Sequence, residues 1–466
     1  MFTRLKTHGL PRASQSPSVA GNADNMLGRR KTGTPPVYNV LAVQAWCEFR
    51  DMPADCGIAA TRPRGAGHAA NNPARRGVEE AMGNNPNSVA SDATVPVMRE
   101  RLMSLDVFRG ATIASMLLVN DPGTWSAVYP PLLHAPWHGW TFTDVIFPFF
   151  LWITGVAMTL STAKRLNRGA TRADLMLHVL RRSVIIFAVG LLLAGFPFFH
   201  FSSIRIPGVL QRIAVCYLIA GAIYLMSGIR GQILWTGGIL VVYWLLMKLY
   251  PVPGYGAGVL EKEGNFAQYI DSLLLSGHMW AQTKTWDPEG IVSTLPAIAT
   301  TLFGVLTGHV LRARKTPEEK TAWMFVMGNA LMFSGAVMSL WLPINKNLWT
   351  SSYSVFMAGL AADVFAFCYW IIDVRGYRKW SMPFQIYGMN AIVIFTLSGL
   401  MAKSALIVKI TGPNGAKQSV WAYVFDHVFA PLASPVNASL MFALSYVLLF
   451  LGIAWLMYRF KWFVKI

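Results

Sequence analysis

The sequence has few charged residues and few cysteines for its length. Only 13% of its 466 residues are charged, whereas 54% are hydrophobic and the mean hydropathy is +0.42. Soluble domains carry about twice that charged fraction, so the composition excludes an ordinary soluble enzyme. The four cysteines form no CxxC pair and no Cys/His cluster, so we expect no bound metal.

Several common catalytic signatures are also missing. The sequence contains no phosphate-binding glycine loop, no serine nucleophile elbow and no HExxH pair. It therefore offers no sign of the nucleotide, serine-hydrolase or zinc-protease chemistry that these motifs support.

Positive charge is in excess. The sequence has 40 Lys and Arg against 22 Asp and Glu, a formal net charge of +18. Such an excess can mark a nucleic-acid-binding protein, but here the basic residues are spread over alternate short connections between apolar runs. This distribution is typical of the cytoplasmic loops of membrane proteins. We therefore expect the lipid bilayer, and no nucleic acid, as a partner.

Long apolar runs fill the sequence from Met98 onward. A membrane-spanning helix needs about 20 apolar residues. Ten runs of that length are at 103–120, 141–162, 178–199, 208–228, 231–250, 290–312, 321–342, 351–373, 382–402 and 436–460. The predicted fold class is an all-α polytopic membrane protein with about ten transmembrane helices. The basic connections place both termini in the cytoplasm (N-in, C-in) and the connection that contains His134 on the opposite side.

Two parts of the chain fall outside this pattern. Residues 1–98 are rich in Arg, Pro, Gly, Asn and Ala and have no apolar signal region. We predict a disordered basic tail, or an artefact of start-site assignment, followed by one transmembrane domain over 99–466. The longest connection, 251–289, is predicted to be either a small cap or a plain linker.

Polar residues gather around the first two predicted spans. Asp106 and Arg109 share one face of the first helix, which ends at NDPG 120–123. His134 lies in the loop that follows, and Asp144 opens the next helix. Charged groups inside a span are costly, so spans that keep them are candidate functional sites.

Seven motifs carry a resemblance to a known family. They are SLDVFRG 104–110, VNDPG 119–123, HAPWHGW 134–140, TDVIFPFFLWITG 143–155, IRIPGVLQRIAVCY 204–217, WDPEG 286–290 and PINKNLW 343–349. In this order they resemble the heparan-α-glucosaminide N-acetyltransferase family and its bacterial relatives, from about residue 99 to the C-terminus. The resemblance implies an acyltransferase that uses cytoplasmic acetyl-coenzyme A as co-substrate. The implied acceptor is a glucosamine-like amino sugar or glycan on the periplasmic side of a bacterial inner membrane.

His134 is the first candidate for catalysis. An imidazole can take a proton from an amine or attack a thioester, although a histidine at a membrane interface can equally be structural. The resemblance implies the catalytic role, because His134 matches the family's proposed active-site histidine. Asn120 and Asp144 are expected to orient the imidazole or bind a sugar hydroxyl. Alternatively, they only end one helix and begin the next.

A second group of residues is predicted to bind the acceptor. Asn345, Lys346, Asn347 and Trp349 combine amides with an aromatic ring, a combination that suits sugars. Asp287 is a further candidate. The structural alternatives are an interfacial tryptophan anchor and, for Asp287, an ordinary helix start.

The third group is predicted to bind the phosphates of acetyl-coenzyme A, because guanidinium groups bind phosphate bidentately. The candidates are Arg109, Arg205, Gln211 and Arg212. Arg181 and Arg182 at the cytoplasmic edge could contribute. The alternatives are an ion pair between Arg109 and Asp106, arginines that snorkel to the interface, and the ordinary cytoplasmic charge bias.

A membrane transporter of amino sugars is the rival function. Ten spans with charged residues inside them suit transport as well as catalysis. An inverted repeat of five spans would favour a transporter, but no convincing internal match is present. A homodimer remains open for either function.

Overall fold

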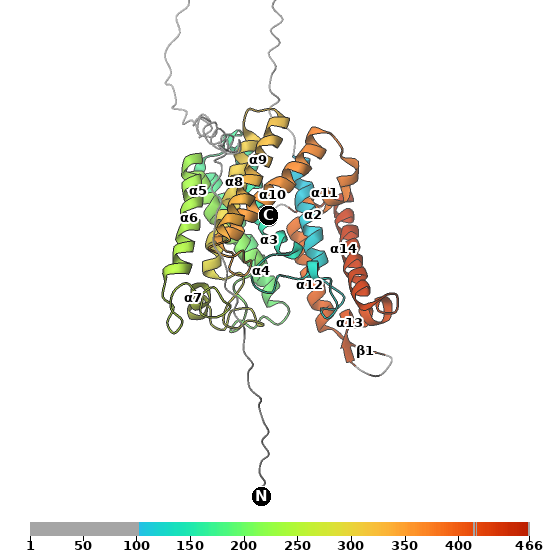
Figure 1. Cartoon of the computed structure of the whole chain (residues 1–466). Helices are drawn as coiled ribbons and strands as arrows, with labels where there is room; N and C mark the ends of the chain where they lie inside the picture. Colours follow the sequence, from blue (N-terminus) through green and yellow to red (C-terminus); the bar gives the residue numbers. More distant parts are fainter. Residues whose placement is uncertain (1–101, 413–414, 416, 465–466) are drawn as a thin grey trace, which may run out of the picture. The chain divides into compact units, whose positions relative to one another are not determined.

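The computed structural model describes residues 102–412, 415 and 417–464, so the predicted tail 1–98 lies outside the described residues. The α-helices are α2 (Met103–Asn120), α3 (Phe142–Leu166), α4 (Arg172–Gly195), α5 (Val209–Met226), α6 (Ile229–Leu249), α7 (Phe266–Leu274), α8 (Ile291–Arg312), α9 (Pro317–Met338), α10 (Ser351–Tyr369), α11 (Met382–Met389), α12 (Ala391–Ile407), α13 (Val420–Val424) and α14 (Pro435–Arg459). A short antiparallel hairpin joins β1 (Lys409–Thr411) to β2 (Lys417–Ser419) (Figure 1).

Eight helices of the described residues are long and apolar enough to cross a bilayer: α3, α4, α5, α6, α8, α9, α10 and α14. The pair α11 and α12 adds a ninth span if the two count as one. Helix α2 forms where the first span is predicted, but with Asp106 and Arg109 among its 18 residues it falls outside this set. The all-α polytopic class is confirmed, whereas ten spans and the N-in, C-in orientation stay predictions.

The helices differ in how deeply they are buried. The apolar stretches of α3 and α8 are 78% buried, against 28% for α4, α6 and α14 and 22% for α9. Helices α3 and α8 are therefore the centre of the bundle. They touch through Gly155 and Gly304, where an added Cβ would overlap the backbone of the other helix. Small residues permit this close approach.

The predicted span 382–402 is broken in the structure. Helices α11 and α12 meet at Asn390 with a bend of 71°. The Asn390 amide donates to the carbonyl of Trp462 at 3.0 Å, and its oxygen accepts from the amide of Val464 at 3.1 Å. A polar side chain inside a membrane needs such partners. The residues after α14 supply them here.

Most long connections gather at one end of the bundle, which we call the loop end; α7 and the β1–β2 hairpin mark it at the bottom of Figure 1. Trp137 lies in a buried cluster with Val252 and Phe266, so the connection 251–289 is a packed cap instead of a plain linker. The amide of Gly139 donates to the carbonyl of Ile344 at 2.8 Å. The loop end thus brings together segments that lie far apart in the sequence.

Candidate active site

His134 and Asp144 form a hydrogen-bonded dyad at the loop end. The Nδ1 atom of His134 lies 2.6 Å from Oδ1 of Asp144. The His134 side chain is 48% exposed, whereas that of Asp144 is 1% exposed. The buried carboxylate therefore holds an imidazole that still reaches the surface.

Local sequence explains where Asp144 lies. Thr141 is the N-cap of α3 and Asp144 its third residue, so the two form a capping box. Oδ2 of Asp144 accepts from the backbone amides of Ala135 and Thr141, each at 3.0 Å. With Oδ2 occupied, Oδ1 is left for the Nδ1–H of His134. The Nε2 atom is then free to take a proton or to attack a carbonyl carbon.

A buried aromatic layer supports this dyad. The hydroxyl of Tyr353 donates to the backbone carbonyl of Asp144 at 2.5 Å. Trp349 packs edge-on against Tyr353 and against Phe147, which follows Asp144 by one turn of α3. Trp349 is fully buried. Its predicted stacking on a sugar therefore has no open face in this structure, because other side chains cover the ring.

The segment 343–349 lies directly beside the histidine loop. Asn345 is fully buried, and its amide lies 3.3 Å from Nδ1 of His138. Lys346 and Asn347 are half-buried, and the ammonium of Lys346 acts electrostatically on both Asp144 and Glu289. Of the four candidate acceptor residues in this segment, Lys346 and Asn347 are the two that remain accessible.

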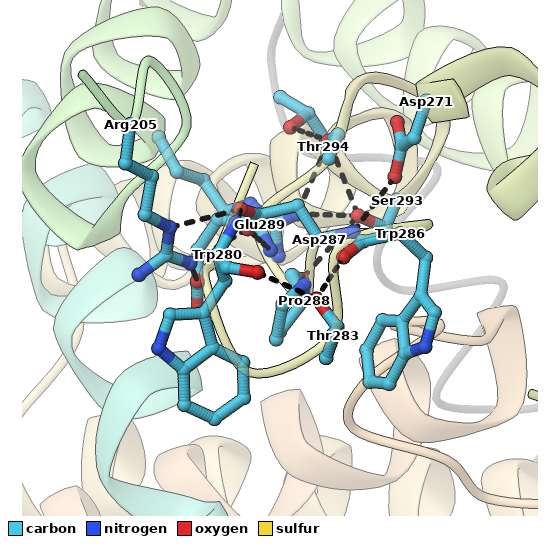
Figure 2. Close-up of polar contacts among 12 residues, drawn as sticks. Arg205, Asp271, Trp280, Thr283, Trp286, Asp287, Pro288, Glu289, Ser293 and Thr294 are labelled. Atoms are coloured by element: carbon cyan, nitrogen blue, oxygen red, sulfur yellow. Dashed lines mark hydrogen bonds and ion pairs between the residues drawn. The ribbon is translucent and has the colours of Figure 1, made fainter. Parts of the chain in front are cut away.

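Arg205 is the centre of an ion-pair cluster at the start of α8, shown in Figure 2. It binds Asp287 through two bonds of 2.6 and 2.8 Å and also binds Glu289. Burial tends to lower the pKa of Arg205, but the two carboxylates raise it above its ordinary value. Burial likewise tends to raise the pKa of Glu289, yet the charges of Arg205, Lys346 and Arg212 hold it below its ordinary value. Asp287 and Arg205 satisfy each other. The N-cap of α8 is Gly290, so Asp287 does not begin this helix as the structural alternative expects.

Arg212 lies behind the same cluster and is 2% exposed. It donates to the carbonyl of Gly290 and to the hydroxyl of Ser293. Its guanidinium also lies 5.1 Å from the centre of the Trp349 ring. Its Nε and Nη1 atoms have no hydrogen-bond partner among the residues that the structure describes. The neighbouring Gln211 is buried as well, against Gly190 and Gly208.

A cavity of about 640 Å³ runs between α2, α3, α4, α5 and the α11–α12 break. On α3 its lining extends from Phe150 to Arg165, roughly 22 Å at about 1.5 Å per residue. Met116, Phe150 and Leu210 line the end nearer to the loop end, and a basic group lines the other. The basic group consists of Arg165, His178, Arg181 and Arg182. The cavity thus suits a long ligand with an anionic head and a less polar tail.

The candidate coenzyme residues separate in space. Arg109 lines the cavity, where it pairs with Asp106 and donates to the carbonyl of Gly388 at 2.8 Å. Arg205, Gln211 and Arg212 are not among the lining residues. Asn120, the predicted partner of His134, ends α2 with an exposed side chain.

Sequence reasoning missed three residues of the site, although one of them, Arg165, belongs to the basic connection after the second predicted span. Arg165 and His178 lie outside the seven motifs, as does Tyr353. Phe150 and Arg165 both line the cavity from α3. Their shared role can be recognised only once the cavity is known.

Comparisons with known proteins place the sequence in a family. The family model described as "Heparan-alpha-glucosaminide N-acetyltransferase, catalytic" matches residues 101–341. The heparan-alpha-glucosaminide N-acetyltransferase of Homo sapiens is 29% identical over an alignment of 353 positions, which covers 63% of this chain and 52% of the relative. The Mus musculus protein of the same name is 27% identical over an alignment of 352 positions, which covers 63% of this chain and 53% of the relative. The chain spans about half the length of these relatives.

Proposed function

Because the chain belongs to the heparan-alpha-glucosaminide N-acetyltransferase catalytic family, we propose that it transfers acetyl from acetyl-coenzyme A to the amine of a glucosamine-like sugar. The observation that carries the proposal is the His134–Asp144 dyad at the loop end. The cavity along the same helix, basic at its far end and apolar at the end nearer to the dyad, supports it. We further propose that the protein resides in a bacterial inner membrane and that the loop end faces the periplasm.

The cavity supports a particular orientation of the donor. The phosphates of the coenzyme would meet Arg165, Arg181 and Arg182, with Arg109 further along the wall. The pantetheine arm would then follow the apolar wall towards Phe150. That residue lies six positions along α3 from Asp144, about 9 Å. The thioester would therefore approach the dyad from inside the bundle, while the acceptor arrives from the loop end.

His134 has two possible roles in the transfer. As a general base, Nε2 takes a proton from the attacking amine while the amine nitrogen bonds to the acetyl carbon and the carbon–sulfur bond breaks. As a nucleophile, Nε2 itself takes the acetyl group, and the amine then displaces the imidazole. In both routes the coenzyme leaves as a thiolate, which gains a proton. Asp144 stabilises the positive charge that the imidazole carries during the reaction.

The acceptor amine must be uncharged to attack. A positive charge nearby disfavours the protonated form of an amine, and the ammonium of Lys346 lies close enough to Asp144 to influence it. Lys346 and Asn347 would then face the acceptor. We propose a cell-wall or imported amino sugar as this acceptor, because a bacterium offers those in place of heparan.

The rival function, transport of an amino sugar, has one supporting observation. The 71° break between α11 and α12 resembles the interrupted helices that line transporter binding sites. The break lies beside the cavity, so it equally suits a donor-binding wall.

One experiment separates these functions. The purified protein in detergent is incubated with acetyl-labelled coenzyme and glucosamine, beside His134→Ala. Label in N-acetylglucosamine that disappears with His134→Ala supports the transferase. Label on the protein without acceptor indicates the acetyl-histidine route. Saturable glucosamine binding without any transfer, unchanged in His134→Ala, would favour the transporter instead.

A further inference from the structure

Trp349 has an unusual backbone conformation for a bulky residue. Its φ angle is +50°, in the left-handed region that glycine prefers, and its side chain is fully buried. A bulky non-glycine residue in this region is strained and persists only where its surroundings enforce it. Such strain gathers at functional sites, so the surroundings of Trp349 are informative.

Four contacts fix the indole. The guanidinium of Arg212 lies over its face at 5.1 Å. Phe147 and Tyr353 meet the ring nearly at right angles, with centroids 5.0 and 5.3 Å away. The indole N–H donates to the hydroxyl of Thr300 at 3.2 Å. The ring is held on its face, at its edges and at its polar atom, which leaves it one orientation.

Two of these contacts lead to the dyad. Phe147 lies one turn after Asp144 on α3, and the hydroxyl of Tyr353 donates to the backbone carbonyl of Asp144. Trp349 therefore touches the helical turn that carries the carboxylate and also the tyrosine that anchors this turn. Since Asp144 aligns the imidazole of His134 through a 2.6 Å bond, a shift of the indole would be transmitted to the imidazole.

We propose that Trp349 is a positioning residue of the transferase, and that Arg212 holds it in place. The strained indole fixes the first turn of α3 so that Asp144 keeps His134 in its reactive orientation. This inference rests on the proposed function, because it assigns a task within that reaction. It gives the buried Arg212 a task other than binding phosphate.

The charged groups around the dyad must be considered in any pH test. His138 belongs to the same loop, and Lys346 approaches from the segment after α9. Arg212 contributes from α5, and Glu289, paired with Arg205, from the start of α8. None of these charged residues is replaced in the variants proposed below. Trp349→Leu removes the ring that Arg212 contacts, so the pH profile of Tyr353→Phe is the one assigned to the dyad.

The test compares Trp349→Leu and Trp349→Phe with Trp341→Phe, a control at an exposed tryptophan just after α9. In Trp349→Leu we expect kcat to fall about 100-fold with the donor KM within threefold of the parent. The acid limb of the pH profile should move to lower pH, because the imidazolium loses its aligned carboxylate. Trp349→Phe keeps a ring and should recover most of kcat.

Tyr353→Phe keeps the test decisive if Trp349→Leu fails to fold. It removes one hydroxyl and should show the same signature, a lower kcat and a shifted acid limb with an unchanged KM. Unaltered kcat and pH profile in the folded variants would overturn the inference, as would an equal loss in Trp341→Phe.

A second readout does not depend on acetyl transfer. Diethyl pyrocarbonate modifies neutral imidazoles, and the half-exposed His134 is open to it. Mass spectrometry across a pH series gives the midpoint of this modification. A midpoint at lower pH in Trp349→Leu and Tyr353→Phe than in the parent protein supports the inference, and an unmoved one overturns it. Loss of acetyl transfer in the parent protein would instead overturn the proposed function.

Discussion

Asp144 holds His134 by a 2.6 Å hydrogen bond while it also caps the helix on which it lies. The described residues contain another capping box formed by a threonine and an aspartate, Thr171 and Asp174 at the start of α4. That second box has no histidine and is exposed to solvent. Two copies of one local motif thus allow the capping role of an aspartate to be separated from its role in the dyad.

Asp144→Asn should abolish most activity. The amide cannot accept from two backbone N–H groups and also stabilise an imidazolium, so we expect kcat to fall by about 10²–10⁴-fold. The buried site should also lose about 1–3 kcal/mol of folding free energy. Rates of acetyl transfer and thermal unfolding measure the two effects. Asp174→Asn is the control, and equal losses in both variants would assign Asp144 to capping alone.

Arg181→Glu should weaken donor binding. Arg181 lines the basic end of the cavity, and a hydrogen bond to a charged group contributes about 1.5–3 kcal/mol. Loss of that bond predicts a Kd for coenzyme A at least tenfold higher, measured by calorimetry in detergent. Arg172→Glu lies on the same helix but outside the cavity lining, and should bind normally. If both charge reversals weaken binding equally, the coenzyme is held by general surface potential.

The cap at the loop end should lose stability as the pH rises. Burial raises the pKa of Asp271 from 3.8 to about 6, against the smaller effect of its bonds to the amides of Ile291 and Asp287. A carboxyl whose pKa is raised on folding favours the folded state at low pH, and this advantage disappears between pH 4 and 6. The loss amounts to about 3 kcal/mol.

Asp271→Asn should therefore flatten this dependence. The apparent melting temperature of the parent minus that of Asp271→Asn should fall as the pH rises from 4 to 7. Glu289 acts in the opposite sense only below its ordinary pKa of 4.5, because its pKa is lowered. A constant difference across the series would mean that Asp271 is charged throughout.

Gly388→Ala should disrupt the packing of α2 against α11. A Cβ at Gly388 would overlap the carbonyl oxygen of Asp106, and backbone cannot give way as a flexible side chain does. We expect a loss of several kcal/mol, on the scale of overpacked cores. In Gly452→Ala the new methyl group meets nothing within 4 Å, and this variant should be stabilised by up to about 1 kcal/mol. Thermal unfolding in detergent compares the two, and similar melting temperatures would contradict the close approach.

Local patterns in the sequence predict the helices and part of the site. An apolar run can be recognised without knowing what it packs against. Eight of the ten predicted spans form helices long and apolar enough to cross a bilayer. The capping box that positions Asp144 spans only Thr141 to Asp144, so it too can be recognised locally. His134 lies ten residues before Asp144, and its role follows from motif resemblance.

Features that depend on distant residues were not accessible from the sequence. The break at Asn390 is stabilised by Trp462 and Val464, which lie more than 70 residues away. The pairing of Arg205 with Asp287 joins residues 82 positions apart and turns two separate predictions, one for the coenzyme and one for the acceptor, into a single ion pair. Nothing in PINKNLW 343–349 indicates that Trp349 is buried with a positive φ.

Helix α3 carries the dyad near its first residue and Arg165 near its last, and its apolar stretch is 78% buried. We expect a helix packed this tightly to shift as one rigid body. If the donor phosphates draw the Arg165 end into a new position, the Asp144 end follows, and the acceptor meets a different site. Thermodynamic linkage then makes the effect reciprocal. The factor by which bound donor changes acceptor affinity must equal the factor by which bound acceptor changes donor affinity.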